Sequence, residues 1–420
     1  MKKKRHIIIG SGAAALSALK QMRKAGCEDA VTVLTMEDYP PYSPMSLPYV
    51  VSDKVKQADI QMVPDGFFDH MNATFTRGRK VVGIAPGEQR VLYNNGKGDS
   101  YDSLLIATGS DPFVPSILKK AGGIGFHVMD DCLALIQQLK ARKKATILGA
   151  GLVAMELAAA LKEKGNEVQV IAPRERILRN YFDIEASRRI IDLFADSGTA
   201  VNVNWGEATA AEQSGNEIKV RFNQDKALET EILLVCIGVK PRVSFLAGSG
   251  IDISEGVVVD RQMRTNIPNI FAAGDAAEAV DFFTGQRGLN PIVPNAVSQG
   301  KIAGSTMAGE KAEYEGWLPM NTFNFFGHLA TSIGKTVPSK GDDALVEKDN
   351  GYYKKIICRD GKLLGAAFLD TDIDAGVIQY LIRKRTEIGR YKDILLHAPR
   401  EVGLWLMNEA EKHETISKEE

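Results

Sequence analysis

The sequence predicts an α/β protein built from two related strand–turn–helix units, followed by a smaller α+β domain. The first observation is a buried strand that breaks into a glycine turn and a helix over residues 5–15. The second is the same order of strand, glycine turn, helix and following strand over residues 145–171. The third is a change of composition near residue 321, where phenylalanines cluster and strands precede a helix. Such a repeat indicates two Rossmann-like domains that each bind one dinucleotide.

The first unit has the residue types that a dinucleotide-binding turn requires. Gly10 permits a tight turn, Gly12 lets the backbone approach a pyrophosphate, and Ala15 allows the helix to pack closely on the strand. The helix would direct its unpaired N–H groups at the phosphates. A tight turn also needs small residues when nothing binds, so this motif alone leaves a structural interpretation open. The next strand ends near Glu37, whose carboxylate could accept hydrogen bonds from a ribose. The alternative is that Glu37 is an acid in a surface turn.

The second unit repeats the pattern with Gly149, Gly151 and Ala154 in the same three positions. After its second strand, Ala172 occupies the place where an acid would bind the ribose of an adenosine, and Arg174 follows. Local chemistry therefore favours a nucleotide with a 2′-phosphate. The alternative is that Arg174 is solvated or paired with a neighbouring acid.

Other candidate ligand contacts lie at strand ends and in one stiff loop. The loop over residues 39–49, which includes Ser46, is rich in proline and tyrosine and forms a shaped surface suited to a flat ring. Thr108 and Gly109 end a buried strand, either beside a ligand or as a plain glycine turn. Gly274 and Asp275 follow another buried strand, where a carboxylate can accept hydrogen bonds from a polyol. The helix that begins at Asn295 would direct its N-terminus at the same ligand.

Composition excludes several classes of function. The formal net charge of -1 gives no electrostatic basis for binding nucleic acid. No segment has the ~20 apolar residues of a membrane span, and the basic N-terminus lacks the apolar stretch of a signal peptide, so we expect a cytoplasmic protein. The four cysteines are far apart, which predicts neither a disulfide framework nor a zinc or iron–sulfur site in this chain.

Taken together, these motifs resemble the FAD-dependent pyridine nucleotide-disulfide oxidoreductase superfamily over nearly the whole chain. The resemblance implies a glutathione-reductase-like fold with FAD on the first unit, its ribityl chain held by Asp275, and NAD(P)H on the second. It implies an FAD-binding domain over residues 1–115 and 245–320, an NAD(P)-binding domain over 116–244, and a C-terminal interface domain over 321–420. In some members an acid at the position of Glu156 lies near the nicotinamide; the alternative is an ordinary polar helix residue.

The loop over residues 42–49 is similar to that of NADH oxidases, NADH peroxidases and CoA-disulfide reductases, where a redox cysteine precedes Leu-Pro-Tyr. Met45 stands at that position, and a thioether forms neither a thiolate nor a stable sulfenic acid. We therefore expect a flavin that exchanges electrons directly with an external acceptor.

The resemblance favours the flavoprotein subunit of a thiamine-dependent 2-oxoacid dehydrogenase complex, with an iron–sulfur subunit as partner and NAD rather than NADP as nucleotide. Three alternatives stay open: a self-sufficient NAD(P)H oxidase, a rubredoxin or ferredoxin reductase, and a docking subunit that binds flavin only for assembly.

Overall fold

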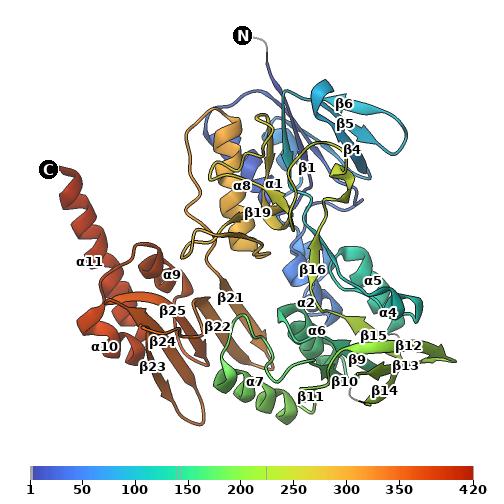
Figure 1. Cartoon of the computed structure of the whole chain (residues 1–420), viewed down its shortest axis with the longest axis vertical. Coiled ribbons are helices and arrows are strands. Elements are labelled where there is room, and N and C mark those ends of the chain that lie inside the picture. The colour runs from blue at the N-terminus through green and yellow to red at the C-terminus, as the bar shows by residue number, and fades with distance from the viewer. Residues whose placement is uncertain (1–2, 140, 142, 224, 420) are drawn as a thin grey trace. The chain divides into compact units, whose positions relative to one another are not determined.

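The computed structural model describes residues 3–139, 141, 143–223 and 225–419, with side chains described as far as Glu411 (Figure 1). The chain divides into two compact units. Unit 1 comprises Met1–Phe113, His127–Ala134 and Gly238–Leu318. Unit 2 comprises Val114–Phe126, Leu135–Ile237 and Pro319–Glu420.

Unit 1 is built around a parallel sheet of five strands in the order β18-β7-β1-β2-β3. Its strands are β1 (Arg5–Ile9), β2 (Ala30–Leu34), β3 (Ala73–Thr76), β7 (Ser103–Ile106) and β18 (Ile270–Ala272). The central strands are nearly continuous runs of buried apolar residues, because helices cover the faces of a parallel sheet.

The remaining elements of unit 1 are shorter or surround this sheet. The helices are α1 (Ala13–Lys24), α2 (Leu47–Val51), α3 (Phe67–His70) and α8 (Val293–Met307). One antiparallel sheet contains β4 (Val81–Ala85), β5 (Arg90–Tyr93) and β6 (Gly98–Ser100). A mixed sheet contains β17 (Val257–Val258), which pairs parallel with β19 (Ala277–Val280), and β20 (Arg287–Gly288), which pairs antiparallel with β19. Strand β8 (Ser110–Pro112) pairs antiparallel with β16 (Val239–Pro241). Helix α5 (Met129–Gln138) contributes residues to both units.

Helices α1 and α8 pack side by side in unit 1, and two glycines make this possible (Figure 1). A Cβ atom at Gly300 would lie 2.2 Å from the carbonyl oxygen of Ala14, and one at Gly304 would lie 2.4 Å from that of Ala18. Each pair is spaced four residues apart on its helix, so the two small faces meet along one full turn. This contact fixes the middle of α8 against the first half of α1.

Unit 2 repeats the parallel architecture in a sheet of order β11-β10-β9-β15. Its strands are β9 (Lys144–Leu148), β10 (Glu167–Ile171), β11 (Ala200–Asn202) and β15 (Ile232–Val235), with helices α4 (Ser116–Lys120), α6 (Leu152–Glu163) and α7 (Ile184–Asp196). An antiparallel sheet of β12 (Ala208–Ser214), β13 (Glu217–Phe222) and β14 (Ala227–Thr230) comes before β15, as β4–β6 come before β7. The repeat of the sequence is therefore a repeat of topology, which confirms the predicted fold class.

The C-terminal part of unit 2 is an antiparallel sheet of order β21-β22-β25-β24-β23 with helices beside it. Its elements are β21 (Met320–Phe325), β22 (His328–Gly334), β23 (Asp343–Lys348), β24 (Tyr353–Arg359), β25 (Lys362–Leu369), α9 (Ala375–Arg383), α10 (Lys392–His397) and α11 (Pro399–Glu419). This is the predicted α+β domain. Within the part of the chain that the structure describes, no helix combines the length and apolarity needed to cross a bilayer.

Contacts from α7 and its N-cap join this antiparallel sheet to the nucleotide-binding fold of unit 2. The ring of Phe194 on α7 stacks on that of Phe325, with centroids 5.2 Å apart. Beside it, the buried ammonium of Lys355 lies 2.6 Å from the carboxylate of Asp183, which also caps the N-terminus of α7. Burial alone raises the pKa of Asp183, but hydrogen bonds from Lys355, Ala186 and Tyr353 together lower it below its usual range.

Candidate functional site

The turn after β1 places Gly10 where another residue does not fit. Gly10 has φ +115°, and a Cβ atom there would lie 2.0 Å from the carbonyl oxygen of Ala107. Its N–H donates to Leu34 O at 2.7 Å, while the N–H of Ala107 donates to Ile9 O at 2.8 Å. The turn is therefore clamped between both neighbouring strands, and Gly10 is required by the backbone itself.

Gly12, by contrast, opens onto free space at the start of α1. It is the N-cap residue in an extended conformation, and a Cβ atom there would meet no described atom within 4 Å. No described side chain caps the helix, and its first turn contains no acid. Helix N-termini with uncapped N–H groups bind phosphate, so this position fits a pyrophosphate. Ala15 is fully buried, as close packing requires.

The second unit has the same turn at β9. Gly149 has φ +108°, and a Cβ atom there would lie 2.1 Å from the carbonyl oxygen of Cys236. Gly151 is the extended N-cap of α6, has open space in front of it and has no capping side chain among the described residues, while Ala154 is fully buried. Each unit therefore has a glycine turn that leads into an uncapped helix N-terminus with open space before it, and we call each of these a cradle because its shape suits a phosphate.

Asp275 lies at the end of β18, close to the α1 turn. A Cβ atom at Gly274, which has φ +78°, would be 3.2 Å from that of Ala14. The Gly274 N–H donates to Gln299 Oε1 at 2.8 Å, so a buried side chain of α8 holds the turn. The Asn295 amide, also buried, donates to Asn290 O at 3.0 Å and orders the entry into α8. The structure thus brings the predicted carboxylate to the first cradle.

Two residues that the sequence analysis missed surround Asp275. The hydroxyl of Ser110 donates to its Oδ2 at 2.7 Å and lies 3.4 Å from the imidazole of His127. Burial lowers the pKa of His127, and the charge of Asp275 only partly opposes this. A neutral imidazole therefore lies beside the carboxylate. Ser110 directly follows the Thr108–Gly109 motif, but nothing local in the sequence pointed to His127.

Thr108 and Gly109 form the junction between β7 and β8. The Thr108 hydroxyl donates to Arg242 O at 2.8 Å, and the Arg242 N–H donates to Gly109 O at 2.9 Å. Gly109 has φ +69°, which favours glycine at this point. The side chain of Thr108 is thus engaged by the returning chain at β16.

Glu37 and the proline-rich loop are tied together by Tyr42. The Tyr42 hydroxyl donates to Glu37 Oε2 at 2.6 Å and accepts the N–H of Met129 at 2.9 Å. Burial and the neighbouring carboxylate raise the pKa of Tyr42, so it stays a donor to Glu37. In the same loop, the Ser46 hydroxyl donates to Ser43 Oγ at 3.1 Å. Sequence reasoning did not foresee that Glu37 shapes this loop.

The loop presents a thioether rather than a thiol. Met45 is 56% exposed, while Cys132 lies beneath the loop, with its Sγ donating to Leu47 O at 3.7 Å. Cys132 is fully buried, and burial raises the pKa of its thiol to about 11. Because the thiolate is the reactive form, Cys132 is inert at neutral pH.

In the second unit, Glu156 on α6 is the acid with the most altered environment. Burial raises the pKa of Glu156 to about 7, and no described residue forms a hydrogen bond or ion pair with its carboxylate. At the end of β10, Ala172 is buried while Arg174 is exposed. The Arg176 guanidinium donates to Arg179 O at 2.8 Å, which orders the segment after Arg174.

Comparisons with known proteins agree with this architecture. A family model described as pyridine nucleotide-disulphide oxidoreductase matches residues 4–300. The chain belongs to this family. A second model, the rubredoxin NAD+ reductase C-terminal domain, matches residues 319–386. The chain is thus an NAD(P)H oxidoreductase of a family that uses FAD.

Two relatives and one solved structure show the range of similar proteins. The NADH-dependent phenylglyoxylate dehydrogenase subunit epsilon of Aromatoleum evansii is 33% identical, covering 96% of this chain and 97% of that protein. The rubredoxin-NAD(+) reductase of Alcanivorax borkumensis is 29% identical, covering 86% and 94%. The water-forming NADH oxidase of Lactobacillus brevis, solved with NADH bound, has a TM-score of 0.85 at 22% identity, covering 92% of both chains, and shares the fold.

Proposed function

We propose that this chain is the flavoprotein subunit of a 2-oxoacid dehydrogenase complex, of which phenylglyoxylate dehydrogenase is the model, and passes electrons between an iron–sulfur subunit and NAD. The observation that carries this proposal is Met45, which is exposed in the loop at the position where related enzymes have a redox cysteine. The chain also has two phosphate cradles, one in each unit. The relative from Aromatoleum evansii, a named subunit aligned over nearly its whole length, supports the larger complex.

We assign FAD to residues 1–115 and 245–320. The residues proposed to hold it are Gly10, Gly12, Ala15, Glu37, Ser46, Thr108, Gly109, Gly274, Asp275 and Asn295. The open space at Gly12 fits the pyrophosphate, and Asp275, oriented by Ser110, fits the ribityl hydroxyls. When bound, FAD supplies the change between two-electron exchange with a nicotinamide and one-electron exchange with an iron–sulfur centre. The protein contributes orientation, and the Tyr42–Glu37 bond keeps the loop in place.

We assign the nicotinamide nucleotide to residues 116–244, held by Gly149, Gly151, Ala154, Glu156 and Arg174. The described C-terminal sheet and helices, over residues 321–419, form the proposed interface domain. NAD is the favoured nucleotide because the relative from Aromatoleum evansii is named as NADH-dependent. NADP stays an alternative, since Ala172 does not repel a 2′-phosphate and Arg174 lies exposed near it.

The substitution Ala172→Asp tests this assignment. We expect it to raise the ratio of kcat/KM for NADH to that for NADPH at least ~10-fold, because a carboxylate there would accept the ribose hydroxyl and repel a 2′-phosphate. Steady-state kinetics with both nucleotides give the ratio, and Ala172→Asn is the neutral control of similar size. An unchanged ratio in Ala172→Asp would show that residue 172 does not face the ribose.

Anaerobic reduction tests the function itself. NADH is expected to bleach the visible flavin absorption of the purified chain, reoxidation by oxygen to be slow, and reoxidation by a small iron–sulfur protein to be fast. Co-purification from the native source with iron- and thiamine-containing subunits would identify the complex. Fast aerobic turnover would instead support a self-sufficient oxidase. Partner binding without any bleaching by NADH or NADPH would support a docking subunit.

A further inference from the structure

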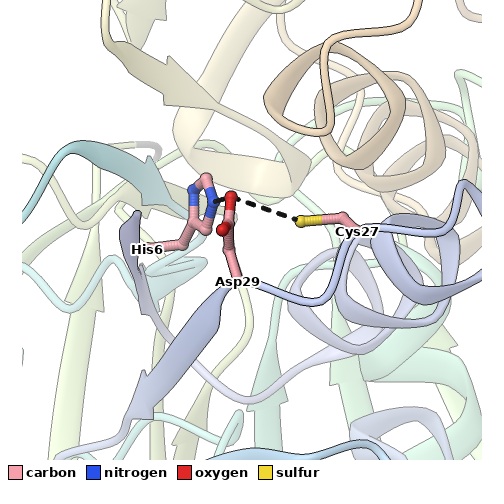
Figure 2. Close-up of side chains that lie close together, drawn as sticks. All are labelled: His6, Cys27 and Asp29. Atoms are coloured by element: carbon pink, nitrogen blue, oxygen red, sulfur yellow. Dashed lines mark hydrogen bonds and ion pairs between the residues drawn. The ribbon is translucent and has the colours of Figure 1, made fainter. Parts of the chain in front are cut away.

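A second cluster of chemically active side chains lies in unit 1, at the edge of the parallel sheet where its strands begin. Figure 2 shows His6 from β1, Cys27 from the turn after α1 and Asp29 just before β2, with their side chains converging. One ligand atom from each residue lies within 4.8 Å of the other two. The spacing of these three residues in the sequence matches no known metal-binding motif, so the sequence alone predicted no metal site.

The distances within this cluster fit a tetrahedral cation. His6 Nε2 lies 3.2 Å and Cys27 Sγ 3.8 Å from Asp29 Oδ2. Zinc bonds of about 2.0–2.3 Å place neighbouring ligand atoms roughly 3.3–3.8 Å apart. Two edges of the ligand triangle therefore already have about the required length, and the third edge, between Sγ and Nε2, is no longer than 4.8 Å.

The imidazole is oriented as a metal ligand requires. His6 is 1% exposed, and its Nδ1 lies 2.5 Å from Ser103 Oγ. In the tautomer that leaves Nε2 free, Nδ1–H donates to this hydroxyl, which is the usual second partner of a ligating histidine.

The other two ligands are held by the backbone around them. The Lys4 N–H donates to Asp29 Oδ1 at 3.0 Å, which leaves Oδ2 directed at the cluster. The Arg23 guanidinium donates to the carbonyls of Cys27 at 2.6 Å and Asp29 at 3.0 Å, fixing the turn that carries both. The Asp29 side chain is 28% exposed, which provides a path for an ion and a water ligand.

We propose that His6 Nε2, Cys27 Sγ and Asp29 Oδ2 bind a divalent cation of borderline softness, with Zn²⁺ as the best match, and that water completes the tetrahedron. On binding, the Cys27 thiol loses its proton to solvent, and the His6 proton moves from Nε2 to Nδ1. One proton is released per ion, and the thiolate and carboxylate balance its charge. The strand β1 separates this site from the Gly10 turn by roughly 13–16 Å, so the ion stabilises the fold rather than taking part in hydride transfer.

The test uses the untagged full-length chain, stripped with a chelator and dialysed against Zn²⁺. We expect one zinc per chain by elemental analysis, and a thiolate-to-metal charge-transfer band when Co²⁺ replaces zinc. Cys27→Ser and His6→Asn should each reduce the zinc content to below about a tenth, and Ser103→Ala should weaken binding roughly 10–100-fold. Glu28→Gln, which changes the exposed acid between two of the ligands, is the matched control and should retain the full content.

A measurement on the unmodified chain guards against variants that fail to fold. Zn²⁺ should slow alkylation of Cys27 by iodoacetamide at least ~10-fold, as followed by peptide mass spectrometry, because the coordinated thiolate is shielded. Substoichiometric zinc, a Co²⁺ spectrum without the charge-transfer band, or zinc retained in Cys27→Ser would each overturn the proposal. So would an alkylation rate that Zn²⁺ leaves unchanged.

Discussion

Gly12→Ala is expected to give a folded chain that binds FAD at least ~100-fold more weakly, a loss of about 2.7 kcal/mol, whereas Gly10→Ala is expected to prevent folding of unit 1. At Gly12 the added methyl group meets no described atom within 4 Å, so it would occupy the space proposed for the pyrophosphate. At Gly10 the methyl group would lie 2.0 Å from a backbone oxygen, at φ +115°. A clash with the backbone just after β7, at a φ that side chains other than glycine rarely adopt, costs more than ~4 kcal/mol, a large part of the ~5–15 kcal/mol stability of a typical domain.

Urea unfolding of the FAD-free chains and titration with FAD separate these two outcomes. The Gly12→Ala chain should unfold within ~1 kcal/mol of the unmodified chain, since Gly12 provides no side-chain cap and alanine at an N-cap typically costs no more than that. The matched pair in the second unit is Gly149→Ala and Gly151→Ala. Gly151→Ala should still bind FAD but lose reduction by NADH. If Gly12→Ala binds FAD normally, the first cradle does not hold the pyrophosphate.

The contrast between Gly10 and Gly12 shows what the sequence determines. Both glycines were predicted from one fingerprint, because the turn needs small residues within a span of a few positions. Only the structure shows why each position requires glycine, because the carbonyl that confines Gly10 belongs to Ala107, almost a hundred residues away in the chain. Local sequence patterns predict which residues a turn requires, but the physical reason for each requirement depends on packing against distant segments.

The residues that sequence reasoning missed all act through distant partners. Gly300 and Gly304 sit within a helix, where glycine normally lowers stability, and their purpose depends on the backbone of α1. Gln299, His127 and Cys132 each meet a partner from another segment, at Gly274, Ser110 and Leu47 respectively. No periodicity or spacing connects these segments, so a single sequence contains no signal for the contacts. The parallel sheets were predictable because the first strand of each unit, β1 or β9, is followed by a glycine turn and a helix, and this pattern occurs twice.

Glu156→Gln is expected to remove a pH dependence from both stability and activity. Burial raises the pKa of Glu156 from the ordinary value of 4.5 to about 7. Between these pH values the unfolded chain gives up the proton that the folded chain keeps, so the stability associated with Glu156 falls as pH rises and is fully lost above pH 7. The free energy of unfolding of Glu156→Gln, relative to the unmodified chain, should therefore increase by about 2–3 kcal/mol from pH 5 to pH 8.

The same substitution distinguishes an acid beside the nicotinamide from an ordinary buried acid. If Glu156 faces the nucleotide, the rate of anaerobic reduction by NADH changes with a midpoint near the pKa of about 7, and Glu156→Gln abolishes that change. Glu167→Gln, at the exposed start of β10, is the control and should alter stability by less than ~0.5 kcal/mol. A change in the stability profile without one in the kinetic profile would place the carboxylate away from the nicotinamide. Nucleotide binding in the second unit would then depend on the helix N-terminus at Gly151, because that proposed phosphate site is formed by backbone geometry and not by the carboxylate of Glu156.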